Sequence, residues 1–144
     1  MMTAQALFEG EEVLALIPQR KPMVMLDTFY EGTDTEALTG LTVQADNLFC
    51  NGRRLTEPGL IEHIAQSASA LAGYTAWRNH QPAPTGYIGE VRKCRIFRLP
   101  EVGEQLRTSV SIISEVMNVS LLLAETKSED NLIASCQMKI YLEK

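Results

Sequence analysis

Long apolar runs are missing from this sequence of 144 residues, and basic charge is scarce. No stretch approaches the roughly 18 apolar residues that a membrane-spanning helix needs, so we expect no such helix. The N-terminus carries glutamates where a secretory signal peptide carries basic residues, and we therefore expect a cytoplasmic protein. Hydrophobic residues make up 45% of the chain, enough for the core of a single domain over residues 1–144.

Cysteine is also scarce. Cys50, Cys94 and Cys136 lie far apart, with no CxxC spacing and no nearby histidine pair. They form neither a zinc-binding pattern nor an even disulfide set, so we expect small buried or half-buried thiols, no metal and no other cofactor. The 13 lysines and arginines are outnumbered by 18 acidic residues, and the net charge of -5 argues against a nucleic-acid partner.

The clearest predicted element is a helix over residues 58–79. Thr56 can cap it, Glu57 suits its positive end, and Pro58 is tolerated in its first turn. Small residues crowd its interior: Ala65, Ser67, Ala68, Ser69, Ala70, Ala72 and Gly73. Because such a helix can be approached closely on several sides, we expect it to lie at the centre of the fold.

Apolar runs bounded by turn residues predict six strands. They cover residues 23–30, 37–44, 86–97, 105–115, 118–127 and 132–142. A short helix is expected over residues 11–16, a loop over 46–56 and a proline-rich connector over 80–85. The order strand, strand, helix and four strands disfavours parallel βαβ units, so it predicts an α+β fold: a long central helix wrapped by an antiparallel sheet of about six strands.

This order resembles the hotdog fold, and three motifs are similar to those of the 3-hydroxyacyl-acyl-carrier-protein dehydratases. Residues 16–27 (LIPQRKPMVMLD) resemble the opening of that family, and residues 57–66 (EPGLIEHIAQ) resemble the start of its helix. Residues 87–89 (YIG) and 97–106 (FRLPEVGEQL) resemble its third strand and the exit from it. A looser resemblance is to the dehydratase-like proteins of aryl-polyene and flexirubin-type pigment synthesis. The resemblance implies a hotdog fold and an acyl-thioester substrate in fatty-acid or polyene-type biosynthesis.

The sequence departs from the family pattern at the histidine. The family's catalytic histidine stands in a His-Phe-Pro-Gly run before the helix, whereas residues 51–56 (NGRRLT) contain no histidine. The histidine of the opening motif is Gln19 here, and the run between Pro58-Gly59 and Glu62 is two residues shorter. These departures affect the assigned chemistry more than the fold or the ligand class.

Dehydration of a 3-hydroxyacyl thioester needs a base near the alpha carbon, an acid for the leaving hydroxyl and donors for the developing enolate oxygen. By resemblance, Glu62 takes the position of the family's glutamate, which acts across a dimer interface with the partner's histidine. His63 is the nearest substitute for that histidine, although it points about 100° away around the helix. The helix start at Gly59 is a candidate oxyanion site, and Gln66 and Gly89 are further candidates for the acyl site.

Each candidate also has a structural alternative. Glu62 could serve only the helix dipole, Gln66 could orient Glu62 or only pack, and His63 could be an interface or partly buried imidazole. For Asp27, at the end of the first apolar run, a structural role is expected. His80, beside the prolines of the connector, is expected to be a solvated loop residue.

The predicted partners follow from charge and from the open sheet. Arg92, Lys93 and Arg95 concentrate positive charge that could hold phosphopantetheine or an acidic acyl carrier protein, or could be a solvated edge. An exposed edge strand predicts a homodimer, or a heterodimer with another hotdog chain. Three functions are open: an acyl-carrier-protein-dependent dehydratase, a non-catalytic hotdog subunit that binds acyl chains or completes a partner's site, and an acyl thioesterase.

Overall fold

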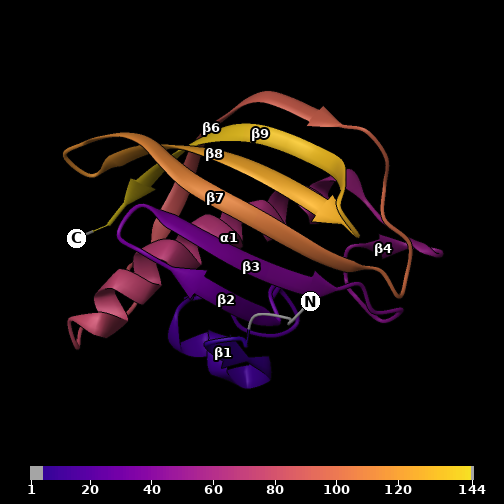
Figure 1. The fold of residues 1–144 in the computed structure, drawn as a ribbon, viewed down its shortest axis with the longest axis horizontal. Helices are drawn as coiled ribbons and strands as arrows, with labels where there is room; N and C mark the ends of the chain where they lie inside the picture. Colours follow the sequence, from indigo (N-terminus) through magenta and orange to yellow (C-terminus); the bar gives the residue numbers. More distant parts are fainter. Residues whose placement is uncertain (1–4, 144) are drawn as a thin grey trace.

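The computed structural model describes residues 5–143 and places one long helix, α1 (Glu57–Arg78), beneath a curved antiparallel sheet (Figure 1). Seven strands form this sheet in the order β1-β2-β3-β7-β8-β9-β6. Their bounds are β1 Phe8–Glu9, β2 Thr28–Gly32, β3 Glu36–Thr42, β6 Gly86–Ile96, β7 Gln105–Val116, β8 Val119–Ser128 and β9 Asn131–Leu142. The predicted α+β hotdog fold is therefore confirmed, and the short β1 joins the six expected strands.

The small residues of α1 allow neighbouring segments to approach its backbone. Ala68, Ala70 and Leu71 are buried in the main apolar cluster together with Phe29 of β2. On the neighbouring side of the helix, a Cβ atom at Gly73 would lie only 1.8 Å from the carbonyl oxygen of Leu16. The N-terminal segment therefore packs directly on the helix backbone at this point.

We expect Gly73→Ala to lower the free energy of unfolding by about 1–3 kcal/mol. The added methyl group would overlap a backbone carbonyl, which cannot rotate away as a side chain can, so the segment or the helix must shift. Ser69→Ala, at a half-buried position of the same helix, is the control and should change stability by less than about 0.5 kcal/mol. Urea unfolding measures both values, and equal stability of the two variants would contradict the close approach.

The segment before β2 differs from the prediction. A strand is predicted over residues 23–30, but β2 begins only at Thr28. The reason is that the Met25 amide donates to the Gln66 side chain and the Met25 carbonyl contacts the His63 ring, and both partners belong to α1. Backbone groups in residues 23–27 therefore form hydrogen bonds with side chains of α1 instead of with a neighbouring strand.

Two further local elements differ in type. The predicted helix over residues 11–16 is a 3-10 helix, η1 (Gly10–Ala15). The predicted loop over residues 46–56 contains a small hairpin of β4 (Cys50–Asn51) and β5 (Arg54–Leu55), separate from the main sheet. Gly52, with φ +65°, makes its turn. This hairpin lies immediately before α1 and packs on its first turn.

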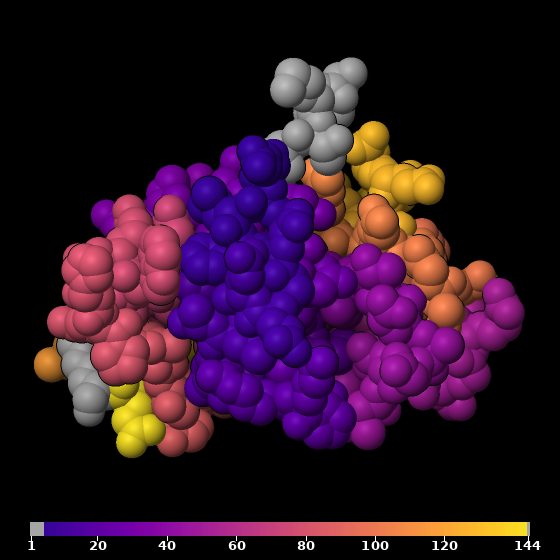
Figure 2. All heavy atoms as spheres, turned by 90° about the horizontal axis from the view of Figure 1, so that it is seen from below, coloured from indigo at the N-terminus to yellow at the C-terminus, as the bar shows by residue number. Residues whose placement is uncertain are grey.

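The N-terminal residues close the side of α1 that the sheet leaves open. Figure 2 shows them (indigo) across the middle of one face, with the end of α1 (rose) beside them. Phe8 of β1 packs edge-on against Phe29, Tyr74 and Trp77. Within residues 5–143 no helix is long and apolar enough to span a membrane.

All three cysteines are free thiols. Cys136 is buried and Cys50 is half-buried, as expected, but Cys94 is exposed, so the prediction is wrong for that residue. Burial raises the pKa of Cys136 to about 12. A buried thiol with so high a pKa stays protonated at neutral pH, and this favours a packing role for Cys136.

Candidate functional site

The half-buried side chain of Glu62 lies in the second turn of α1, where Gln66 fixes one of its oxygens. The Gln66 Nε2 atom donates to Glu62 Oε2 over 2.8 Å. Residues four apart stack on one face of a helix, so this contact follows from the helical period. The carboxylate is thus held in place and is still partly open to solvent.

Gln66 itself is fully buried and is fixed by two further hydrogen bonds. Its Oε1 accepts from the Met25 amide at 2.6 Å, and its Nε2 donates to the Met23 carbonyl at 2.7 Å. An amide hydrogen requires an acceptor and a carbonyl requires a donor, so the flipped amide would lose both bonds. Gln66 therefore has one orientation, and in it one N–H group points at Glu62.

His63 lies in the core and has no exposed surface. Its Nδ1 is 2.7 Å from the Met25 carbonyl oxygen, and its Nε2 is 2.7 Å from the Thr108 hydroxyl. A carbonyl can only accept, so Nδ1 carries the proton and Nε2 accepts from Thr108 in the neutral ring. Burial lowers the pKa of His63 and so favours this neutral form. A side chain in this position cannot touch a substrate, which favours the structural alternative over the predicted catalytic role.

A chain of buried hydroxyl groups extends from His63 into the sheet. Thr108 of β7 is 2.7 Å from Thr126 of β8 through their side-chain oxygens. Ser67 donates to the His63 carbonyl at 2.8 Å and lies 2.7 Å from the hydroxyl of Thr39. Sequence reasoning missed the three threonines. Their inward-facing positions in predicted strands were the available signal, since a buried hydroxyl requires a partner.

The two candidate glycines have clear packing reasons. A Cβ atom at Gly59 would lie 2.6 Å from the Phe49 Cβ and 2.7 Å from the Leu55 Cδ1, so the hairpin packs closely on the helix start. A Cβ atom at Gly89 would lie 2.0 Å from the Tyr141 ring, at a register shift of β6. Packing accounts for glycine at position 59, whereas at Gly89 the neighbouring Tyr141 ring is exposed and could turn away. The acyl-site roles of both glycines stay predictions.

The basic residues lie on β6, the edge strand, which pairs only with β9 in the described sheet. Arg92, Lys93 and Arg95 are all exposed. Arg92 forms an ion pair with Glu90 of the same strand, and Lys93 has a positive φ of 49° beside a second register shift. The structure brings the three together on one strand, and it leaves Lys93 and Arg95 as the candidates for an acidic partner.

Other arginines near the predicted patch bind acids of this chain. Arg98 forms two hydrogen bonds with Glu104, at 2.9 and 2.7 Å, and Arg54 lies 3.7 Å from Glu101. The Arg98 guanidinium lowers the pKa of Glu104 to about 2, with help from the Glu101 amide and the Ser128 hydroxyl. These pairs organise the loops around the helix start and reduce the positive charge available for docking.

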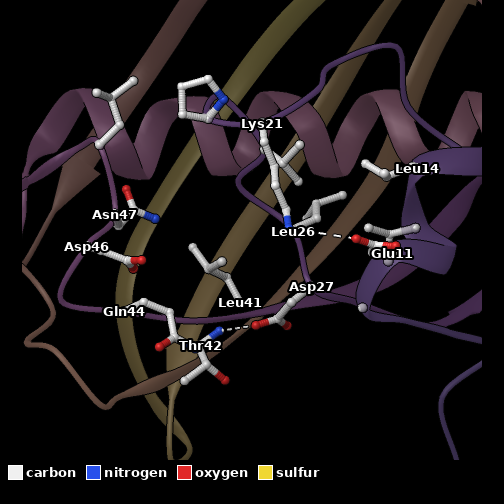
Figure 3. Close-up of a pocket in the computed structure, with 15 residues that line it drawn as sticks. Glu11, Leu14, Lys21, Leu26, Asp27, Leu41, Thr42, Gln44, Asp46 and Asn47 are labelled. Carbon is white, nitrogen blue, oxygen red and sulfur yellow. Dashed lines mark hydrogen bonds and ion pairs between the residues drawn. The ribbon is translucent and has the colours of Figure 1, made fainter.

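Asp27 has the structural role that was expected. Its Oδ2 accepts from the Thr42 amide at 2.7 Å and its Oδ1 accepts from the Thr28 hydroxyl at 2.8 Å, tying β2 to β3. Asp27 also lines a surface cavity of about 520 Å³ between η1 and the residues after β3 (Figure 3). None of the predicted site residues lines this cavity, so it is separate from the Glu62 site.

The sequence contains two histidines, and neither is placed to act together with the Glu62 carboxylate. His63 is buried, and His80 lies beyond the far end of α1, about 25 Å from Glu62 at 1.5 Å per residue. His80 is exposed, as predicted. The described residues hold no group of three or more side chains suited to a metal ion. The site therefore presents one positioned carboxylate without a histidine from its own chain.

Comparisons of sequence identify similar proteins over nearly the whole chain. The sequence model of the ApeP-like family, ApeP dehydratase, matches residues 11–144. The 3-hydroxyacyl-[acyl-carrier-protein] dehydratase FabZ of Shewanella woodyi is 25% identical over 134 residues, covering 89% of this chain and 88% of that protein. Its counterpart in Shewanella amazonensis has the same identity and coverage.

Solved structures share the fold at low sequence identity. The dehydratase heterocomplex ApeI:P of Xenorhabdus doucetiae matches with a TM-score of 0.81 and 17% identity, over 92% of this chain and 91% of that chain. A hypothetical thioesterase of Streptococcus pneumoniae, crystallised with coenzyme A, matches with a TM-score of 0.65 and 5% identity, over 80% and 84%. At these identities the structural matches support the hotdog architecture only.

Proposed function

Since the chain belongs to the ApeP-like dehydratase family, we propose that it supplies the carboxylate half of a dehydratase site for 3-hydroxyacyl groups carried as thioesters on acyl carrier protein. The observation that carries this proposal is the Glu62 carboxylate, partly open and held by a locked Gln66. In this proposal Glu62 is the catalytic residue and Gln66 is a positioning residue.

Loss of water from the substrate needs two proton transfers. One group takes the proton from the carbon beside the thioester carbonyl, and the carbon–oxygen bond at the next carbon breaks as its hydroxyl takes a proton. The products are water and a double bond between the two carbons. Glu62 can perform one transfer, and a histidine is suited to the other, because its ordinary pKa lies near neutral pH.

We further propose that a second hotdog chain supplies this histidine. A second copy of this chain would bring only a buried His63 and a remote His80. The β6 edge has unpaired backbone groups and exposes Tyr87, Ile88 and Val91 by 57%, 42% and 36%, features that favour pairing with another sheet. The resemblance to one chain of a dehydratase heterocomplex supports a partner of a different kind.

The test is turnover with and without such a partner. The purified chain is incubated with 3-hydroxyacyl thioesters alone, and then together with a hotdog dehydratase that retains the His-Phe-Pro-Gly run. Mass spectrometry follows the loss of water. We expect the chain alone to be about 100-fold or more slower than the assembly, because one of two proton-transfer groups is missing. Full activity of the chain alone would contradict the two-chain site.

The remaining predictions concern docking and the competing reaction. We propose that Lys93 and Arg95, on the exposed edge, contact the acidic carrier or its phosphopantetheine arm. The cytoplasmic location stays a prediction. The same incubations test thioester hydrolysis, which would release free thiol instead of water. The family membership and the positioned Glu62 carboxylate favour dehydration. Release of thiol without an enoyl product would instead favour the thioesterase alternative.

A further inference from the structure

A groove separate from the Figure 3 cavity opens between the C-terminal half of α1 and the sheet. It has a volume of about 490 Å³. On the helix side it is lined by small residues, among them Ala68, Ala72 and Ala76, and on the sheet side by aliphatic residues. The sheet residues come from β7, β8 and β9 and are Ile112, Leu122, Ile140 and Leu142. Small and aliphatic side chains thus face each other across the groove, polar side chains complete its lining, and no aromatic residue is among those described as lining it.

The groove lies on the same helix face as Glu62. From Glu62, residues at helical spacing are Ala65, Ser69, Ala72 and Ala76, and all are half-buried. Ala72 and Ala76 line the groove, and only the small side chains of Ala65 and Ser69 lie between them and Glu62 on this face of the helix. From Glu62 to Ala76 the distance along the helix is about 21 Å, at 1.5 Å per residue. A chain attached at the reacting carbons could therefore extend along α1 into the groove.

The far end of the groove is rich in carboxylates. Asp34, Glu115 and Glu143 line it, and the lining within residues 5–143 includes no lysine or arginine. Arg78 offsets part of this charge through its ion pair with Asp34. Glu115 accepts from Ser120 and Glu143 accepts from Tyr87, so neutral donors hold these two acids. The carbonyl end of α1 adds a partial negative charge at the same place.

We infer that this groove binds the distal part of a long, uncharged acyl chain and discriminates against a chain that ends in a carboxylate. This inference rests on the proposed function, because it takes Glu62 as the position of the reacting carbons. Apolar lining favours an aliphatic or polyene chain by removing it from water. A terminal carboxylate would approach Glu115 and Glu143 in a partly desolvated groove, where like charges repel more strongly than in water.

The first measurement is binding of S-octadecyl-pantetheine, a non-hydrolysable thioether whose chain is long enough to reach the groove from Glu62, by calorimetry, with the chain assembled with its partner. Ala72→Phe places a large ring in the groove and should weaken binding about tenfold or more, because the distal carbons lose their apolar contacts. Ala15→Phe is the matched control, since Ala15 is exposed and lies outside the groove. Its affinity should stay within about twofold of the wild type. Equal affinity of the wild type and Ala72→Phe would overturn the inference.

The second measurement needs no bulky substitution. The unmodified protein should bind S-octadecyl-pantetheine about tenfold more tightly than the same compound with a carboxylate at the end of its chain. The double variant Glu115→Gln with Glu143→Gln should lose most of this preference. Equal affinity for both ligands in the unmodified protein, or no binding of either, would refute the inference. Calorimetry requires no turnover, so a failure of the groove is distinguishable from a failure of Glu62 as the catalytic residue.

Discussion

Replacement of Glu62 by glutamine is expected to lower the rate of water loss by about 10²–10⁴-fold in the assembly with the histidine-bearing partner. Glutamine keeps the size of the side chain, and its carbonyl oxygen can still accept from Gln66. It cannot donate or accept a proton in the reaction, so the change removes the chemistry and leaves the contacts. Initial rates of enoyl thioester formation, measured by mass spectrometry, give the value.

Glu57→Gln is the control for this experiment. Glu57 is also an acidic residue in the N-terminal part of α1, but it is exposed and lies in the first turn. Its loss should change the rate less than about threefold and stability by less than about 1 kcal/mol, the size of a helix-dipole effect. If Glu62→Gln and Glu57→Gln lowered the rate equally, Glu62 would be only a helix-terminus acid.

His63→Asn is expected to lower the free energy of unfolding by about 3 kcal/mol or more. Asparagine cannot bridge the Met25 carbonyl and the Thr108 hydroxyl, so at least one buried polar group is left without its partner and a cavity forms. The same substitution at His80, which is exposed, should change stability by less than about 0.5 kcal/mol. Urea unfolding at neutral pH compares the two variants, and similar small losses would contradict the buried network.

The pH dependence of stability gives a second readout of His63. Burial lowers its pKa in the folded state, so below about pH 6.5 the unfolded chain binds a proton that the folded chain does not. Stability should therefore be independent of this group above that pH. As the pH falls below about 6.5, the free energy of unfolding should decrease by up to about 1.4 kcal/mol per pH unit, until the pH reaches the lowered pKa of His63 in the folded state. This slope should be absent in His63→Asn.

The strongly patterned elements of the fold could be predicted from the sequence. The helix predicted over residues 58–79 is α1 (Glu57–Arg78), because an early proline and many small residues mark it clearly. Thr56 stands at the N-cap position as predicted, but its hydroxyl donates to the Phe49 carbonyl and does not cap the helix. Strands β7, β8 and β9 agree with their apolar runs within a few residues. Residues 23–27 were misassigned because the partners of their backbone groups are side chains about 40 positions away, and no local pattern encodes such partners.

The candidate site was predictable only in part. Helical spacing alone places Gln66 beside Glu62, and the hydrogen bond between them is present. The burial of His63 depends on how residues 16–27 and the sheet pack around α1. Helical spacing alone does not reveal this packing. Gly59 could not be explained from the sequence either. The β4–β5 hairpin packs closely against it, but a loop was predicted for those residues.

The central claim is that the acid and the histidine of one reaction centre come from two different chains. The most direct measurement uses a partner that retains its His-Phe-Pro-Gly histidine but has lost its own helix carboxylate. Assembled with the unmodified chain, this partner should form the enoyl product, because Glu62 provides the missing group. Assembled with Glu62→Gln, it should be inactive. Equal product formation in both assemblies would show that Glu62 takes no part in the reaction.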